Sequence, residues 1–142
     1  MPVSFQDIVF SFEFVGSSPG DNRAILARRT GKIYWRSAIS GLDELPDDAE
    51  DGEAEDGEEY IAIPDKRELG LGKPLALDFA RQCLPDDFDE VSYIFGGRGA
   101  YRNFRAFLNR KKALERWYAF EAKATEQALR EWCELNAIEV EG

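Results

Sequence analysis

The stretch that decides the fold class is Arg23-Ala-Ile-Leu-Ala-Arg-Arg-Thr-Gly-Lys-Ile-Tyr-Trp-Arg36. Apolar and aromatic residues are concentrated at its two ends, Arg23–Arg28 and Lys32–Arg36, with a Thr-Gly pair between them. A glycine such as Gly31 supplies the positive φ that a tight turn between antiparallel strands commonly requires. The pattern therefore predicts a β-hairpin over residues 23–37.

A third strand is predicted over Glu59–Ile63, directly before Pro64, a residue that ends strands. The segment that precedes it, residues 43–59, contains eleven acidic residues and no basic residue. Such a run repels itself and offers little to bury, so we expect a flexible acidic loop between two strands of one sheet. The functional alternatives are an internal mimic of a polyanion and a divalent-cation site, although for the latter the segment lacks the ligand spacing of an EF-hand.

Helical spacing of apolar residues precedes this sheet. Residues 4–15 place apolar side chains on one stripe, whereas Phe10 and Phe14 fall on the opposite side. Either this second face is covered within the chain or it meets another subunit. Phe10 and Phe14 are therefore the candidate contacts of a homo-oligomer, which would also cover the edges of so small a sheet.

From Lys73 onward the spacing predicts four helices. Pro74 and Pro85 open the first two, a third follows the glycine-rich turn at residues 96–99, and a long fourth covers about Lys112–Leu135. An N-terminal helix, a small antiparallel meander of about three strands and a C-terminal helical half make an α+β fold. The length of 142 residues predicts that residues 1–142 form a single domain.

The formal net charge of −10 comes from the acidic segment rather than from the chain as a whole. Outside residues 43–59 the chain holds 17 acidic and 18 basic residues. Its 44% of hydrophobic and 13% of aromatic residues are ample for a core, which excludes a disordered acidic chain. No apolar window is long enough for a membrane span and no targeting segment is recognisable, so we expect a cytoplasmic protein with no membrane partner.

The composition also argues against an enzyme. The chain has no His, which removes the commonest general base and metal ligand. Cys83 and Cys133 lie in helical apolar patterns without a base beside them, so we expect buried, free cysteines. No nucleophile elbow, phosphate-binding loop or distinct carboxylate pair is present. We therefore expect no catalytic residue, no metal site and no cofactor.

Residues 97–112 hold six basic residues and no acidic one, the only strong positive concentration in the chain. Arg98, Arg102 and Arg105 are four and three residues apart, which places them on one face of a helix. Arginines at this spacing can hold successive phosphates or carboxylates. The candidate anion- or RNA-binding residues are Arg98, Tyr101, Arg102, Arg105, Arg110, Lys111 and Lys112.

Two other roles for the arginines stay open. In the first they are structural and pair with carboxylates of the preceding helix. The carboxylates available are Asp86, Asp87, Asp89 and Glu90. In the second the chain is an adaptor that contacts another protein through aromatic residues. The aromatic residues of that surface would be Trp117, Tyr118 and Trp132.

Three segments resemble a known family: Gly97–Arg105, Trp117–Phe120 and Trp132–Ile138. In these, and in its N-terminal helix, hairpin and third strand, the chain is similar to uncharacterised protein family 0158, a group of small bacterial proteins. The acidic segment is matched least well. The resemblance implies a bacterial, cytoplasmic protein and supplies no activity, substrate or catalytic residue.

The predicted N-terminal helix and bent sheet are also similar, at the level of fold alone, to the opening of Sm-like RNA-binding domains. Those domains have five strands, against the three predicted here. A variant Sm-like arrangement would again leave sheet edges for a second subunit to cover.

Overall fold

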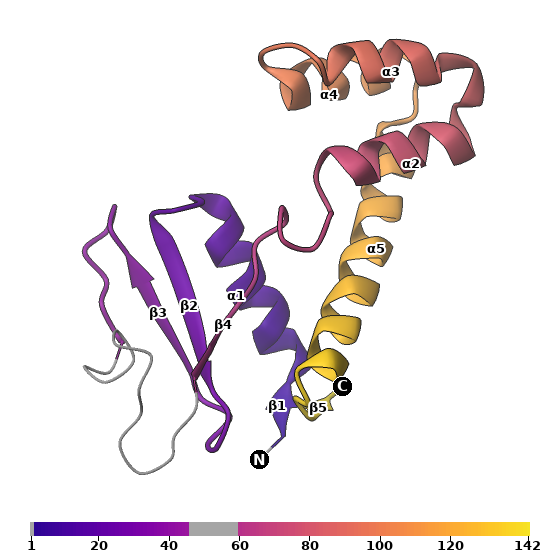
Figure 1. Ribbon diagram of the computed structural model, residues 1–142. Coiled ribbons are helices and arrows are strands. Elements are labelled where there is room, and N and C mark those ends of the chain that lie inside the picture. The colour runs from indigo at the N-terminus through magenta and orange to yellow at the C-terminus, as the bar shows by residue number, and fades with distance from the viewer. Residues whose placement is uncertain (1, 46–59) are drawn as a thin grey trace. The chain divides into compact units, whose positions relative to one another are not determined.

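The computed structural model describes residues 2–45 and 60–142 of the chain (Figure 1). The chain divides into two compact units, one made of residues 1–65 with 128–142 and the other of residues 66–127. Helix α5 (Leu114–Leu135) passes from the second unit into the first. The single domain stays a prediction, and most of the predicted acidic loop, residues 46–59, lies outside the described residues.

The first unit contains the predicted three-stranded antiparallel sheet. Its strands are β2 (Asn22–Ala27), β3 (Ile33–Ser37) and β4 (Tyr60–Ala62). Leu26 of β2 lies opposite Ile33 on one side and Ile61 on the other. Together with the helices of the chain, this sheet confirms the α+β class.

The order of the strands is β3-β2-β4, so the prediction of a meander, in which β4 would pair with β3, was wrong. The chain that follows β3 already occupies its outer edge. The Ser37 N–H donates to the Leu42 carbonyl at 2.8 Å, and the Glu44 N–H donates to the Trp35 carbonyl at 3.0 Å. β4 therefore pairs with the other edge of β2.

Helix α1 (Phe5–Ser17) packs against this sheet, chiefly on β2. The Trp35 indole N–H donates to Ser11 Oγ at 3.0 Å, and the Phe14 ring stacks on Trp35 with 4.4 Å between centroids. The second face of α1 is therefore partly covered within the chain. The fully or almost fully buried side chains of this core are Phe5, Ile8, Phe12, Val15, Ala24, Ile25, Leu26 and Ala27.

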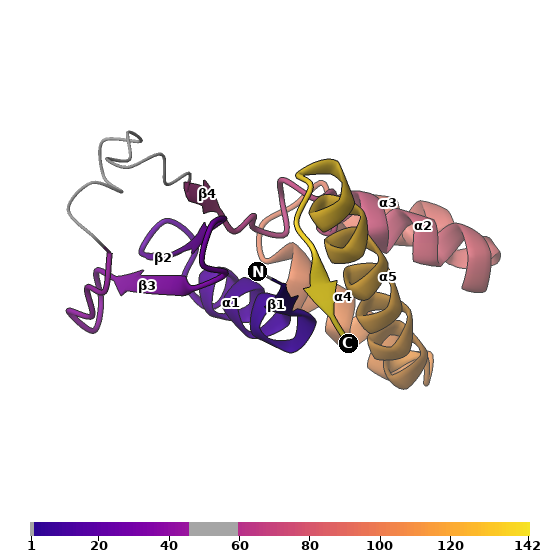
Figure 2. The ribbon, with the colours of Figure 1, turned by 90° about the horizontal axis from the view of Figure 1, so that it is seen from below.

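The two ends of the chain form a second, two-stranded sheet that the sequence did not predict (Figure 2). Its parallel strands are β1 (Val3–Ser4) and β5 (Val140–Glu141). The Val3 N–H donates to the Glu139 carbonyl at 2.9 Å. Beside the pair, the Arg130 guanidinium of α5 lies over the Phe5 ring, 4.0 Å from its centroid.

The second unit is helical, as predicted. It contains α2 (Lys73–Cys83), a short 3-10 helix (Pro85–Asp87), α3 (Phe88–Ile94), α4 (Ala100–Arg110) and the first part of α5. Its core is aromatic. Phe79 contacts Trp117 and Phe120 at 5.4 and 5.3 Å between ring centroids, and Phe104 contacts Trp117 at 5.1 Å. Among the described residues, no helix combines the length and apolar character that a membrane crossing needs.

We expect Phe79→Ala to lower the free energy of unfolding by about 3–5 kcal/mol, because truncating a fully buried ring leaves a cavity among its neighbours. Urea unfolding followed by circular dichroism measures the loss. Tyr118→Ala, which truncates an exposed aromatic of α5, is the matched control and should change stability by less than about 0.5 kcal/mol. A loss below about 1 kcal/mol for Phe79→Ala would contradict its place in the core.

Candidate functional site

The basic segment, residues 97–112, folds as a glycine turn followed by helix α4. Gly99 precedes the helix with φ 64° and ψ 32°, a left-handed conformation that suits glycine. The helix begins at Ala100, so Arg98 lies before it. The prediction that Arg98 shares a helical face with Arg102 and Arg105 was therefore wrong, because Gly99 breaks the helical path between them.

Helix α4 is strongly amphipathic. Phe104, Phe107 and Leu108 are buried, and they occupy one side of the helix. Arg102 and Arg105 are three residues apart on the opposite side, where both side chains are exposed. Burial of the apolar side therefore fixes the direction in which these two arginines project. Arg98, on the preceding turn, is also exposed.

The carboxylates of the preceding helix pair with the end of the basic segment rather than with these arginines. Lys111 Nζ lies 3.3 Å from Asp87 Oδ1, and Arg110 Nη2 lies 3.9 Å from Glu90 Oε1. Within residues 2–45 and 60–142, no carboxylate lies within 4 Å of Arg98, Arg102 or Arg105. Arg110 and Lys111 thus take part in ion pairs, whereas the guanidinium groups of Arg98, Arg102 and Arg105 keep their donors available to an anion.

The remaining predicted residues lie around the same helix. Lys112 is exposed and has a positive φ of 55°, two residues after the end of α4. Tyr101 is 43% exposed, and its ring meets Phe95 edge-on at 5.4 Å between centroids. Burial, and secondarily the negative charge of Glu121, raise the pKa of Tyr101. Its hydroxyl therefore stays protonated at neutral pH and can donate a hydrogen bond.

The unit that carries α4 differs in charge from the rest of the chain. Residues 66–127 contain twelve Lys and Arg against nine Asp and Glu, a net charge of +3. The other unit contains six against nineteen, a net charge of −13. The overall charge of −10 therefore conceals a unit whose field can attract an anion.

One exposed aromatic near this surface was missed by the sequence analysis. Tyr93, at the end of α3, has 85% of its surface exposed, the highest value among the aromatic residues that the structure describes. The signal was present in the sequence, because the apolar stripe of α3 runs through Phe88, Val91 and Phe95 and leaves Tyr93 off it.

The two predicted oligomer contacts, Phe10 and Phe14, have different surroundings. Phe14 is engaged by Trp35, whereas Phe10 is half exposed and lines a groove of about 460 Å³ between α1 and β3. The groove combines apolar walls with the charged side chains of Asp7, Lys32 and Glu44. A homo-oligomer through Phe10 stays a prediction.

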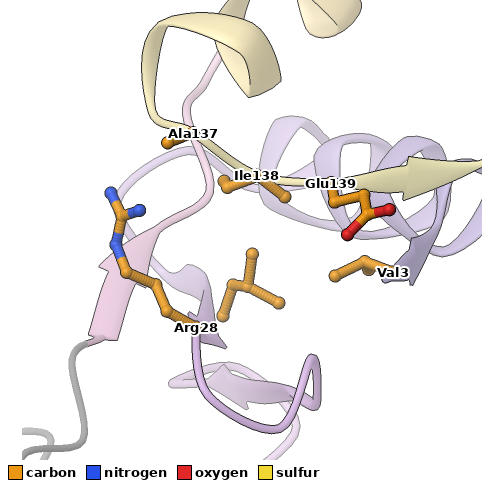
Figure 3. A pocket seen from close by; sticks show the side chains of 6 residues that line it. Val3, Arg28, Ala137, Ile138 and Glu139 are labelled. Carbon is orange, nitrogen blue, oxygen red and sulfur yellow. The ribbon is translucent and has the colours of Figure 1, made fainter. Parts of the chain in front are cut away.

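A smaller pocket of about 160 Å³ lies beside the β1–β5 pair (Figure 3). The Arg28 guanidinium borders it and donates to the Asn136 carbonyl, and Glu139 stands on another side. Its other lining residues, Val3, Leu26, Ala137 and Ile138, carry no nucleophile or general base. We assign no chemistry to this pocket.

The two cysteines of the chain differ in burial. Both are free, as predicted, and Cys133 is buried whereas Cys83 is half-buried. Burial raises the pKa of the Cys133 thiol, which the positive charge of Arg130 only partly opposes. A thiol in this state is a weak nucleophile at neutral pH. Within the described parts of the chain, His, Cys, Asp and Glu side chains form no group of three or more that could hold a metal ion.

Comparison with known proteins gives no match to any family model, curated protein or solved structure. The similarity to uncharacterised protein family 0158 rests on the segments quoted above and stays a prediction. The Sm-like similarity likewise stays at the level of a predicted fold.

We expect Gly99→Ala to lower the free energy of unfolding by about 1–2 kcal/mol, because an L side chain is strained in the left-handed conformation. Gly99→Asn should lose less, since Asn tolerates this region. Gly16→Ala in α1 is the matched control: its added methyl group meets open space at an ordinary backbone conformation, and stability should rise by up to about 1 kcal/mol. Equal effects of the two alanine substitutions, measured by urea unfolding, would contradict this account of the turn.

Proposed function

We propose that the chain is a non-enzymatic binding module that contacts an anionic partner, most simply RNA, through the arginines around helix α4. The observation that carries the proposal is the exposure of Arg98, Arg102 and Arg105 without a carboxylate partner in the described parts of the chain. Exposed ion pairs contribute little to stability, but unpaired guanidinium groups keep their full capacity for bidentate binding of phosphate.

The spacing of the arginines favours an extended polyanion over a single small anion. Arg102 and Arg105 project from one side of a rigid helix, and Arg98 lies on the turn before it. Each guanidinium presents five donors in a planar fork, so each can hold a separate phosphate. A strand with regularly spaced phosphates therefore satisfies more of these groups than a lone phosphate does.

The alternative is a protein adaptor in which the arginines are structural. Exposed Tyr118, at 48%, supports a contact surface on α5. Trp117, however, is buried in the aromatic core, and Trp132 is half-buried. Of the three aromatic residues of the adaptor hypothesis, Trp117 is therefore unavailable as a contact, whereas Tyr118 is exposed and Trp132 is partly exposed.

We expect the double variant Arg102→Ala and Arg105→Ala to weaken binding to a fluorescent RNA by about tenfold or more at low salt, because two phosphate contacts are lost. The slope of log affinity against log salt concentration should fall by about 1–2, at roughly 0.7 per phosphate on a single strand. Fluorescence anisotropy over a salt series measures both quantities.

The matched control is the double variant Arg67→Ala and Arg116→Ala, which removes two exposed arginines of the same unit outside the basic segment. It should keep most of the affinity. If wild-type protein shows no RNA binding at low salt, or if both double variants behave alike, the proposed interface is wrong.

The acidic segment should oppose binding through its charge. Changing the nine carboxylates of residues 47–59 to amides moves the net charge from −10 to −1 without altering the length of the chain. We expect RNA affinity to rise severalfold at low salt and the gain to shrink as salt screens the charges. A gain that persists at high salt, or no gain at low salt, would contradict an electrostatic effect.

A further inference from the structure

The turn between α3 and α4 joins an exposed aromatic ring to the unpaired arginines. Tyr93 is 85% exposed, although Val91, two residues earlier on the same short helix, is fully buried. A tyrosine ring left in water at this level stabilises nothing within the chain, since ring burial is what gives aromatic residues their contribution to a core. Most of the Tyr93 surface is therefore accessible to a flat ligand.

The turn itself is compact and fixed. The Gly96 N–H donates to the Tyr93 carbonyl at 3.1 Å, and the Gly97 N–H donates to the Ile94 carbonyl at 3.2 Å. Exposed glycines then lead directly to Arg98, so no side chain other than that of Phe95 or Ile94 stands between the tyrosine and the arginine along the chain. Two successive hydrogen bonds keep these two residues on one tight turn.

Aromatic packing holds the turn against α4. The Phe95 ring contacts Tyr101 at 5.4 Å and Phe104 at 5.1 Å between centroids, both edge-on. Phe104 is fully buried, whereas Tyr101 remains partly exposed beside Arg102. The end of α3 and the start of α4 are thus packed together, and the exposed residues of this turn and of the first turn of α4 include Tyr93, Arg98 and Arg102.

We propose that this turn binds unpaired nucleotides, with a base stacked on Tyr93 and the neighbouring phosphates held by Arg98 and Arg102. The inference rests on the proposed function and specifies its ligand as single-stranded RNA. Arginines alone do not distinguish a duplex from a single strand, because both present phosphates. An exposed ring does, since the faces of bases are available for stacking only when the bases are unpaired.

The experiment compares a fluorescein-labelled single-stranded RNA of about 10 nucleotides with a blunt-ended RNA duplex of the same length. Wild-type protein should bind the single strand more tightly. Tyr93→Ala should weaken single-strand binding by about 5- to 150-fold, the range that loss of one stacked base produces. Its affinity for the duplex should not change. Tyr93→Phe, which keeps the ring, should bind the single strand like wild type.

Two further measurements separate loss of stacking from other causes. Tyr118→Ala removes an exposed tyrosine of the same unit outside the turn and should leave single-strand binding unchanged. Inorganic polyphosphate, which has phosphates and no bases, should bind wild-type and Tyr93→Ala protein with equal affinity, measured as the inhibition constant corrected for the RNA affinity of each protein. A urea unfolding curve for Tyr93→Ala that overlays the wild-type curve shows that the fold is kept.

The measurements distinguish a failure of the stacking inference from a failure of the proposed function. Equal binding of duplex and single strand by wild-type protein, or a Tyr93→Ala effect of the same size on both, would overturn the stacking inference while leaving the arginine interface in place. No binding of either RNA at low salt would overturn the proposed function and the inference together.

Discussion

Phe104 is fully buried, and its ring contacts Phe95 at the end of α3 and Trp117 of α5, in both cases at 5.1 Å between centroids. Because these contacts come from two sides, they fix the rotation of α4 about its own axis. Helical geometry then determines the direction of the remaining side chains of α4. Phe107 and Leu108 point inward, and Arg102 points outward. The exposure of the arginines is therefore a consequence of aromatic packing on the other side of the helix.

Much of the fold could be predicted because its elements are long enough to show a period. The helices of the second unit carry apolar stripes bounded by Pro74, Pro85 and the glycines at residues 96–99, and the hairpin has its turn at Gly31. The order of the strands could not be predicted in this way. It depends on residues 42–44, which pair with the outer edge of β3 without any period of their own. β1 and β5, with two residues each, are likewise too short to leave a pattern.

The candidate site was predictable in its composition and less so in its geometry. The absence of acidic residues among six basic ones marks residues 97–112 in the sequence alone. The helical spacing of the sequence, however, includes Arg98 on the same face as Arg102 and Arg105. The left-handed backbone of Gly99 instead leaves Arg98 outside the helix. Spacing also could not decide which basic residues meet a carboxylate, because Asp87 and Glu90 reach Lys111 and Arg110 through tertiary packing. Side-chain partners between separate helices are a property of the folded unit.

The pairing of β1 with β5 gives the first unit a mechanical property. The strands are parallel, so the chain enters at the start of one and leaves at the end of the other. A force that pulls the two ends apart acts along the strands and falls first on bonds such as that from the Val3 N–H to the Glu139 carbonyl. The hydrogen bond from Arg130 Nη2 to the Gly142 carbonyl, at 2.6 Å, shares this load. The hydrogen bonds between β1 and β5 would therefore break before such a force acted on β2.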